Sequence, residues 1–440
     1  MFNFFTPNEA KSTILKRNSI DDYEIPEGIQ RNIFKLFGEN LTPDQVVRKI
    51  LKDVRENGDT SLQKWTMKLD GISQSTFRIS NEEIKSSMDM ISEDIKQALE
   101  QSIDRVRAFH QRQPVSSWIS NDLGGTVGQL IRPIRRVGLY IPAGTAPLPS
   151  SVIMSAVPAQ VAGVQEIVLV APPDRKTGKI SPVILATAAM LGLDEIYSIG
   201  GAQAIAALAY GTETIIPVDK IFGPGNLFVT LAKKQVFGTV GIDNLAGPTE
   251  TMVIADEKAK PAWVAADLLA QAEHDLLASA ILLTPSRKLA EQVREEILIQ
   301  KKKLSRPEMI DSALSNRGGA VITKNLEEAI ALANEYAAEH LCLAVKDPWT
   351  WVEKITAAGG IFIGENSFEV LGDYNAGPSH VMPTSGSARF ASPINIMDFV
   401  KIISLIGLDN TTVSQIAPAA AIIARAEGLD AHANAAEIRL

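Results

Sequence analysis

The chain has 440 residues, of which 45% are hydrophobic, and its formal net charge is -8. A chain of this length buries a large core and is expected to form more than one lobe. The acidic balance lacks the basic excess of a duplex-binding surface, so nucleic acid is not an expected partner. The single cysteine, Cys342, excludes an intrachain disulfide and fits a reducing compartment.

The first part of the chain is predicted to be mainly helical. Residues 1–25 are polar and predict an N-terminal arm; they lack the basic start and apolar run of a signal peptide. From Asp44 to Val106 the apolar residues recur at helical spacing. No stretch of about 18 uncharged apolar residues suits a membrane span, so we expect no membrane partner and a cytoplasmic protein.

From Arg136 onward, short apolar strands alternate with helical runs. The segments RVGLYIPAG, EIVLVAPP and EIYSIGG are predicted strands, separated by the helical runs PSSVIMSAVPAQVAGV and SPVILATAAMLGL. ETMVIADE, SAILLTP and HLCLAV continue the pattern, and a helical segment ends the chain. Such alternation predicts parallel sheets with helices on their faces.

These elements predict an α/β protein with two Rossmann-like lobes of mainly parallel sheet. A helical arm at residues 1–25 precedes the lobes, and a short C-terminal helical tail at 391–440 follows them. One lobe is predicted to combine residues 26–135 with 248–390. Residues 136–247 are predicted to form the other lobe, inserted into the first.

The five histidines of the chain differ in their settings. His110 lies in the polar sequence AFHQRQ and is predicted to be a surface residue. Gln271 and His274 are three residues apart in LLAQAEHD, which puts both on one helix face within reach of one ion. A carbonyl oxygen and an imidazole nitrogen suit zinc. The alternative is a histidine that only sits near the negative end of a helix dipole.

Glu339 and His340 stand between a predicted helix and the apolar strand HLCLAV. Edges of α/β sheets are where ligands bind, and an adjacent carboxylate and imidazole can divide acid and base work. The alternative is an incidental helix end. The segment GDYNAGPSHVMPTSG contains Asp373 and His380 and has almost no apolar pattern, which is typical of either a functional or a disordered loop.

Two further segments have simple alternatives. Glu427 and His432 lie on the last helical segment, where a lone histidine is normally a surface residue. No GxGxxG or GxxxxGK[ST] motif announces a nucleotide. In IFGPGN, a strand leads into a helix through Gly223 to Asn226, and the amides at that helix start could face an anion. A plain turn would have the same sequence.

Taken together, these segments are similar to histidinol dehydrogenases over nearly the whole chain. The matching stretches are RVGLYIPAG, SIGGAQAIAALAYGTE, DKIFGPGN, AGPTE, LLAQAEHD, EHL, GDYNAGPSHVMPT, ARF and EGLDAHA. The resemblance implies an enzyme with one zinc ion per subunit that oxidises L-histidinol twice with NAD, through an aldehyde, to L-histidine. That reaction is the last step of histidine biosynthesis. The resemblance also implies a homodimer with shared active sites, in which each tail reaches the partner subunit.

The resemblance assigns roles to individual residues. The implied zinc ligands are Gln271, His274, Asp373 and His432. The implied acid/base pair is Glu339 and His340. The residues implied to contact substrate are Thr249, Gln271, His274, His340, Asp373, His380, Glu427 and His432. The residues implied to contact NAD are Tyr140, Gln203 and Asn226, so the inserted lobe is expected to bind NAD and the other lobe to carry zinc.

One departure from the family leaves the substrate open. Thr249 stands in AGPTE where histidinol dehydrogenases commonly carry serine. A related zinc and NAD dehydrogenase of another small alcohol, such as a sulfonated diol, is therefore an alternative. From other classes, we consider an aldehyde dehydrogenase-type mechanism with Cys342 as nucleophile, a zinc hydrolase without a dinucleotide, and a non-catalytic binding protein.

Overall fold

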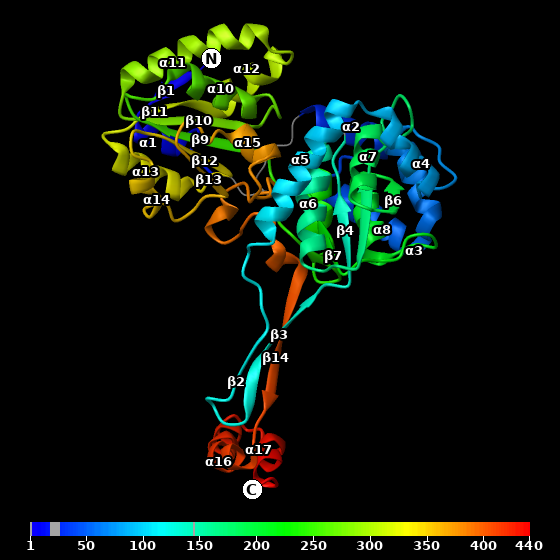
Figure 1. Cartoon of the computed structure of the whole chain (residues 1–440). Coiled ribbons are helices and arrows are strands. Elements are labelled where there is room, and N and C mark those ends of the chain that lie inside the picture. Colours follow the sequence, from blue (N-terminus) through cyan, green and yellow to red (C-terminus); the bar gives the residue numbers. More distant parts are fainter. Residues whose placement is uncertain (1, 18–26, 144–145) are drawn as a thin grey trace.

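The computed structural model describes residues 2–17, 27–143 and 146–440. These residues form two α/β lobes that lie side by side and a narrow stalk that projects away from them (Figure 1). Each lobe is a parallel sheet with helices on both faces, so the predicted fold class is confirmed. Within the described residues, no helix combines the length and the apolar character needed to cross a membrane.

Lobe I is built on a five-stranded parallel sheet with the order β6-β5-β4-β7-β8. Its strands are β4 (Arg136–Tyr140), β5 (Glu166–Ala171), β6 (Glu195–Ser198), β7 (Lys220–Phe222) and β8 (Gly241–Ile242). The chain runs outward from β4 to β6 and then returns to place β7 on the other side of β4. Open α/β sheets bind ligands at such a reversal, outside the carboxyl ends of the strands.

Helices cover both faces of this sheet. One face is covered by α4 (Asn81–Ser86), α5 (Glu93–His110), α6 (Pro149–Val161) and α7 (Pro182–Met190). The other face is covered by α2 (Glu27–Phe37), α3 (Pro43–Asp70), α8 (Gly201–Tyr210) and α9 (Leu227–Val236). Lobe I is therefore a three-layer sandwich with a core on each side of the sheet.

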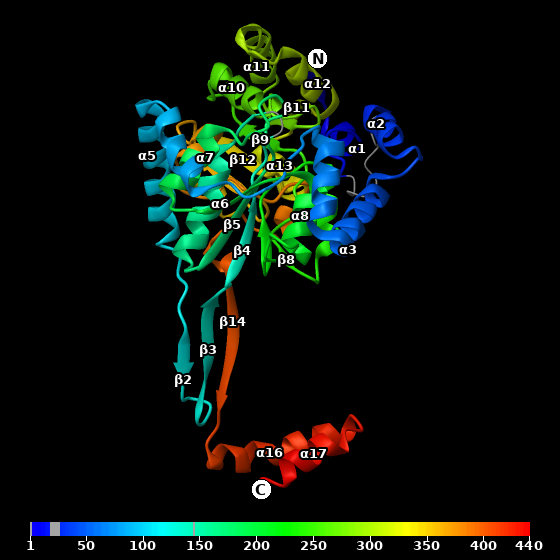
Figure 2. The same cartoon turned by 90° about the vertical axis from the view of Figure 1, so that its right-hand side faces the viewer.

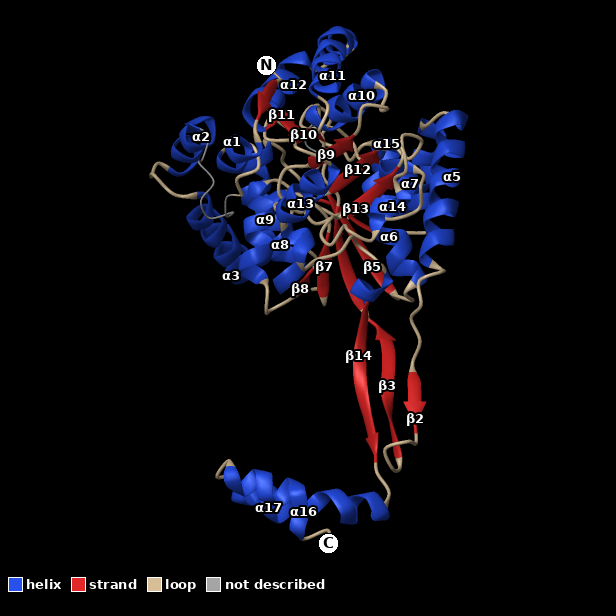
Figure 3. Ribbon diagram, turned by 90° about the vertical axis from the view of Figure 1, so that its left-hand side faces the viewer, coloured by secondary structure: helices blue, strands red, loops and turns tan. Residues whose placement is uncertain are grey.

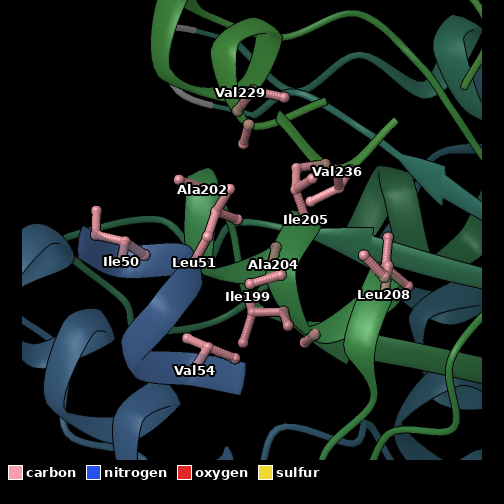
Figure 4. Packing of buried hydrophobic residues seen from close by; sticks show 14 of the residues in the cluster. Ile50, Leu51, Val54, Ile199, Ala202, Ala204, Ile205, Leu208, Val229 and Val236 are labelled. Atoms are coloured by element: carbon pink, nitrogen blue, oxygen red, sulfur yellow. The ribbon is translucent and has the colours of Figure 1, made fainter. Parts of the chain in front are cut away.

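The predicted grouping of residues 26–135 with 248–390 differs from this arrangement, because helices α2 to α5 pack on lobe I. Ile50 and Val54 of α3 lie in one buried cluster with Ile205 of α8 (Figure 4). The helical spacing identified the apolar stripe of α3 correctly. An aliphatic stripe does not specify which sheet it covers, so the sequence pattern could not assign these helices to a lobe.

Lobe II is built on a six-stranded parallel sheet with the order β1-β11-β10-β9-β12-β13. Its strands are β1 (Asn3–Phe5), β9 (Glu250–Ala255), β10 (Ser279–Thr284), β11 (Gly318–Ile322), β12 (His340–Ala344) and β13 (Gly360–Ile363). Apart from β1, the strand order repeats that of lobe I. The N-terminal residues are thus an edge strand of lobe II, and residues 18–25 of the predicted arm lie outside the described residues.

The helices of lobe II also cover both faces. One face packs against α10 (Pro261–Ala272), α11 (Arg287–Gln300) and α12 (Pro307–Arg317). The other packs against α1 (Pro7–Ser12), α13 (Leu326–Tyr336) and residues around α14 (Trp349–Val352). Ala10 of α1 is fully buried in this second cluster. The first residues of the chain are therefore part of the lobe II core.

The stalk is an antiparallel sheet that carries two helices at its tip (Figures 2 and 3). Its elements are β2 (Trp118–Ser120), β3 (Thr126–Pro133), β14 (Val400–Gly407), α16 (Asn410–Ala426) and α17 (Asp430–Glu437). The predicted tail at 391–440 is helical at its end, but it also contains the strand β14. The partner of this strand, β3, precedes the whole lobe I sheet in the chain. A pairing between segments so far apart leaves no local sequence pattern.

Many aliphatic side chains of the stalk and its tip are exposed in the single chain. They include Ile119, Ile402, Ile403, Ile406, Ile416, Ile422, Ile423 and Ile438. A strand ribbon of this width is marginally stable on its own, and exposed apolar patches mark interaction surfaces. The stalk therefore has the character of an interface.

Candidate active site

Most of the predicted site residues of lobe II gather at the amino end of its sheet, on the side that meets lobe I. Thr249 directly precedes β9, and His340 is the first residue of β12. Strands β9 and β12 are neighbours, with His340 in register with Thr251. Ligand sites of α/β sheets usually lie at the carboxyl end of the strands, whereas these residues lie at the amino end. The site forms because lobe I faces this edge.

Thr249 joins a predicted zinc ligand to the predicted acid/base pair. Its Oγ1 lies 2.9 Å from Gln271 Oε1 and 2.7 Å from Glu339 Oε2. Gln271 lies in the last turn of α10 and is 2% exposed. The hydroxyl has one proton to donate, and an ionised Glu339 is the stronger acceptor. The hydroxyl that threonine shares with serine is therefore used inside the site.

His340 is held by both of its ring nitrogens. Nδ1 lies 3.1 Å from the carbonyl oxygen of Glu250, and Nε2 lies 3.4 Å from Asp373 Oδ1. A carbonyl oxygen only accepts, so Nδ1 carries the proton and donates it. In the neutral ring, Nε2 then carries the lone pair. His340 is 2% exposed, so its orientation is fixed by these contacts and by packing.

The predicted loop at residues 372–386 is folded against both lobes. Asp373 lies on the short helix α15 (Glu369–Tyr374), and the carbonyl oxygen of Asp373 is 2.7 Å from His380 Nδ1. His380 Nε2 lies 3.5 Å from Ser151 Oγ of α6. The Ser379 hydroxyl donates to the carbonyl of Met154 at 3.0 Å. This loop brings Asp373 and His380 to the boundary between the lobes.

Burial and neighbouring charges shift the protonation of the acid/base pair. Burial raises the pKa of Glu339 to about 7, against the opposing effects of His340 and the Thr249 hydroxyl. Burial alone would lower the pKa of His340, but the carboxylates of Glu339 and Asp373 outweigh it and raise that pKa. Burial also opposes ionisation of Asp373, yet the hydrogen bond and charge of His340 keep its pKa below the usual value.

His274 is an exposed residue in the turn after α10, not on the helix itself. Its N–H donates to the carbonyl oxygen of Gln271 at 3.1 Å, so the two residues remain one turn apart. The charge of His274 contributes to the lowered pKa of Asp373, although burial and His340 have larger effects. His274 is therefore adjacent to Gln271 and within electrostatic reach of Asp373.

The structure does not bring Glu427 and His432 to this group within one chain. Glu427 directly follows α16 and His432 lies on α17, and both side chains are exposed at the far end of the stalk (Figure 1). Among the described residues, no cluster of three histidine, cysteine or acidic side chains is placed to hold a metal ion. Within one chain, the predicted zinc site is short of a ligand.

The predicted NAD contacts lie at the carboxyl edge of the lobe I sheet, around the reversal of strand order. Tyr140 ends β4, and its hydroxyl accepts from the Gly201 N–H at 3.1 Å. Burial raises the pKa of Tyr140 to about 12, so this hydroxyl is protonated. Gln203 is 1% exposed, and its Oε1 finds no hydrogen-bond donor among the described atoms. Asn226 caps α9 by accepting from the N–H groups of Phe228 and Val229.

A buried ion pair, which sequence reasoning missed, fixes the loop before α9. Lys233 and Asp243 pair beneath the loop. Lys233 Nζ donates to the carbonyl oxygen of Gly223 at 2.9 Å, and Asp243 Oδ2 accepts from the Gly223 N–H at 2.7 Å. Gly223 has φ +111°, and a Cβ there would collide with the carbonyl oxygen of Tyr140. The loop is therefore held in a fixed conformation at the carboxyl edge of the sheet, and it is more than a plain turn.

Two other sequence expectations are settled by burial. Cys342 is buried within β12 and donates to Glu369 at 3.0 Å. Burial and the charge of Glu369 raise the pKa of this thiol well above its usual value, which argues against a cysteine nucleophile. His110 is fully buried and lies 3.0 Å from Gln113 Oε1, so the prediction that it is a surface residue was wrong.

Known proteins match nearly the whole chain, and the model of the family described as histidinol dehydrogenase matches residues 39–440. The chain is 48% identical over 434 residues to the histidinol dehydrogenase of Deinococcus radiodurans, covering 98% of each. It is 50% identical over 396 residues to that of Moorella thermoacetica, covering 89% of this chain and 93% of the relative. The crystal structure of histidinol dehydrogenase from Elizabethkingia anophelis aligns with a TM-score of 0.90 at 36% identity, covering 100% and 98% of the two chains. The chain is therefore an oxidoreductase and belongs to the histidinol dehydrogenase family.

Proposed function

We propose that this protein oxidises L-histidinol to L-histidine with zinc and two molecules of NAD, as the last step of histidine biosynthesis. The observation that carries the proposal is the group formed by the buried Glu339 and His340 with Thr249, whose hydroxyl donates to Glu339. This group lies at the boundary of two Rossmann-like lobes, beside Gln271 and Asp373. It unites an acid/base pair with oxygen donors for a metal, which neither a hydrolase nor a binding protein accounts for as simply.

The residues present fit a zinc ion. Gln271, His274 and Asp373 offer two oxygen donors and one nitrogen, a set that zinc accepts. We propose His432 of a second subunit as the fourth ligand, because it is exposed at the tip of the stalk. When bound, zinc would hold the substrate by its neutral nitrogens and position the alcohol.

The residues at the edge of lobe I fit a dinucleotide. Gln203 Oε1 is a buried acceptor that finds no donor among the described residues, so a donor from a bound ligand would satisfy it. The Gly223 turn is held rigid by Lys233 and Asp243 and has no Cβ, so a ligand at this edge can approach the main chain closely. Tyr140 lies between them at the strand-order reversal. Two NAD molecules, bound here one after the other, would each accept one hydride.

The acid/base pair divides the proton transfers. In the first oxidation, His340 Nε2 takes the proton of the alcohol oxygen as hydride leaves the carbon. In the second, Glu339 takes a proton from the water that attacks the aldehyde, and hydride leaves again. Thr249 donates to Glu339 at 2.7 Å and so favours its ionised form. His380 and Glu427 are proposed to contact the substrate.

The exposed stalk supports a homodimer with shared active sites. Its exposed aliphatic side chains would be buried by a partner surface. Glu427 and His432 are also exposed and could complete the active site of another subunit. Exchange of tails between two copies would achieve both through one two-fold interface. We therefore propose that each tail supplies these two residues to the other subunit.

Removal of the metal tests this function. We expect the zinc-loaded protein to form NADH from L-histidinol and NAD, and the chelated protein to form none until zinc is returned. Absorbance of reduced nicotinamide measures the reaction, and metal analysis measures zinc content. An absence of NADH at full zinc occupancy would contradict the proposed substrate. A related dehydrogenase of another small alcohol, such as a sulfonated diol, would then be tested, beginning with variants of Thr249.

The rate of NADH formation is expected to rise as pH rises through about 7. Below this value Glu339 is protonated and cannot take a proton from water. The neutral form of His340 also grows with pH, but its pKa is raised to about 10, so the limb of the profile that belongs to His340 lies above that of Glu339. Steady-state rates at a series of pH values measure the profile, and Glu339→Gln should remove the limb that belongs to Glu339. A rate that falls through this range would contradict these assignments.

A further inference from the structure

The main chain of Glu250 holds both members of the acid/base pair. Its N–H donates to Glu339 Oε2 at 3.0 Å, and its carbonyl oxygen accepts from His340 Nδ1, 3.1 Å away. One residue at the start of β9 therefore sets the position of the carboxylate and the tautomer of the imidazole. A displacement of Glu250 would disturb both groups together.

The side chain of Glu250 is anchored by Arg17, which comes from the N-terminal residues of the chain. Both guanidinium NH2 groups of Arg17 contact the two carboxylate oxygens, with Nη2 2.9 Å from Oε2. The N–H of Ser385 donates to the same carboxylate at 3.0 Å. The carboxylate is 4% exposed and the Arg17 side chain 24%. A paired carboxylate and guanidinium of this kind fix direction as well as distance.

The same guanidinium holds the turn that carries Glu339. Nε of Arg17 donates to the carbonyl oxygen of Tyr336 at 3.0 Å, and Nη2 donates to that of Ala337 at 3.3 Å. The guanidinium also lies over the Tyr336 ring, 3.5 Å from its centroid. Ala337 has φ +54°, which turns the chain from α13 toward Glu339. Arg17 thus ties the start of β9 to the turn before β12.

We propose that Arg17 is a positioning residue for the acid/base pair and acts through Glu250. The inference rests on the proposed function, because the pair is defined by that reaction. It makes Arg17, a residue of the N-terminal segment, part of the support of the acid/base pair, through its contacts with Glu250 and with the turn before Glu339. A shift of the pair by about 1 Å is enough to reduce turnover about 100-fold.

Arg17→Met is the first variant, and Lys11→Met is its matched control. Lys11 also ties the N-terminal residues to α13, through an exposed ion pair with Glu335 at 2.6 Å, but it does not contact Glu250. We expect Arg17→Met to lower kcat about 100-fold with a much smaller change in the KM for L-histidinol and an unchanged zinc content. Lys11→Met should stay within about twofold of wild type.

A second variant separates positioning from stability. Arg17→Met leaves the buried Glu250 carboxylate without its cation, which can unfold the protein. The double variant Arg17→Met, Glu250→Gln removes both charges, so we expect it to fold while its kcat stays about 100-fold below wild type. Glu250→Gln alone should lower kcat about as much as Arg17→Met, and the double variant should show no further loss, because both changes remove the same contact. A folded double variant with wild-type kcat would overturn the proposal.

The histidine NMR signals give a readout that does not depend on turnover. The chain has five histidines, so the His340 signal can be assigned with His340→Asn. We expect Arg17→Met, or the double variant if the single one unfolds, to move the His340 signal and leave that of His110 in place. Lys11→Met should move neither. An unmoved His340 signal in the Arg17 variant contradicts the positioning role. If the signal moves but the wild-type protein oxidises no L-histidinol, only the proposed function is contradicted.

Discussion

His340→Asn is expected to slow NADH formation about 1,000-fold while the zinc content stays at that of wild type. Asparagine can still donate to the carbonyl oxygen of Glu250, but it offers no basic nitrogen in place of Nε2. The alcohol proton then has no acceptor of suitable basicity. Steady-state rates and metal analysis on the same preparation measure the two quantities.

Glu339→Gln separates the two oxidations from each other. If Glu339 activates the water of the second oxidation, this variant should release the aldehyde after one NADH, whereas His340→Asn is blocked before it. Glu335→Gln is a matched control because it removes an exposed carboxylate four residues away. Loss of zinc from His340→Asn, or full activity in it, would contradict the role given to this histidine.

His432→Ala is expected to lose both zinc and activity, and a mixture of this variant with His340→Asn is expected to regain activity. In a mixed dimer, one site joins a normal lobe II to a normal tail, while the other carries both changes. Random exchange of subunits should therefore restore about a quarter of the wild-type activity. Enzyme assays after dissociation and reassembly of the two proteins measure the recovery.

The control mixture combines His340→Asn with Glu339→Gln. Both of these changes lie in lobe II, so no site in their mixed dimer is intact. The complete oxidation, measured as L-histidine formed, should therefore not return. If the first mixture also stays inactive although mixed dimers have formed, each tail serves its own subunit. The exposed positions of Glu427 and His432 would then need another explanation.

The alternating strands and helices were sufficient to predict the α/β class and its parallel sheets. The alternating pattern does not predict where a strand or helix packs when its partner lies far away in the chain. Strand β14 pairs with β3, and helices α2 to α5 cover lobe I, because contacts between distant segments decide these placements. Local propensity and period report only which face of a segment is apolar.

The candidate site was predictable where unusual side chains interrupt an apolar pattern. Gln271, Glu339 and His340 stand out in this way, and the structure places them in one network through Thr249 and Glu250. Glu250 is part of AGPTE, but no role was predicted for it from the sequence. Its main chain, and not its side chain, binds Glu339 and His340. Arg17 gave no signal, since a single arginine in a polar segment looks like any solvated residue.

The most direct test of the proposed reaction is the number of NADH molecules formed per L-histidinol consumed by the zinc-loaded enzyme. The account predicts two, because the aldehyde stays in the site and Glu339 serves the second oxidation. A ratio of one would mean that the aldehyde leaves after the first oxidation, and it would contradict both the four-electron reaction and the role of Glu339.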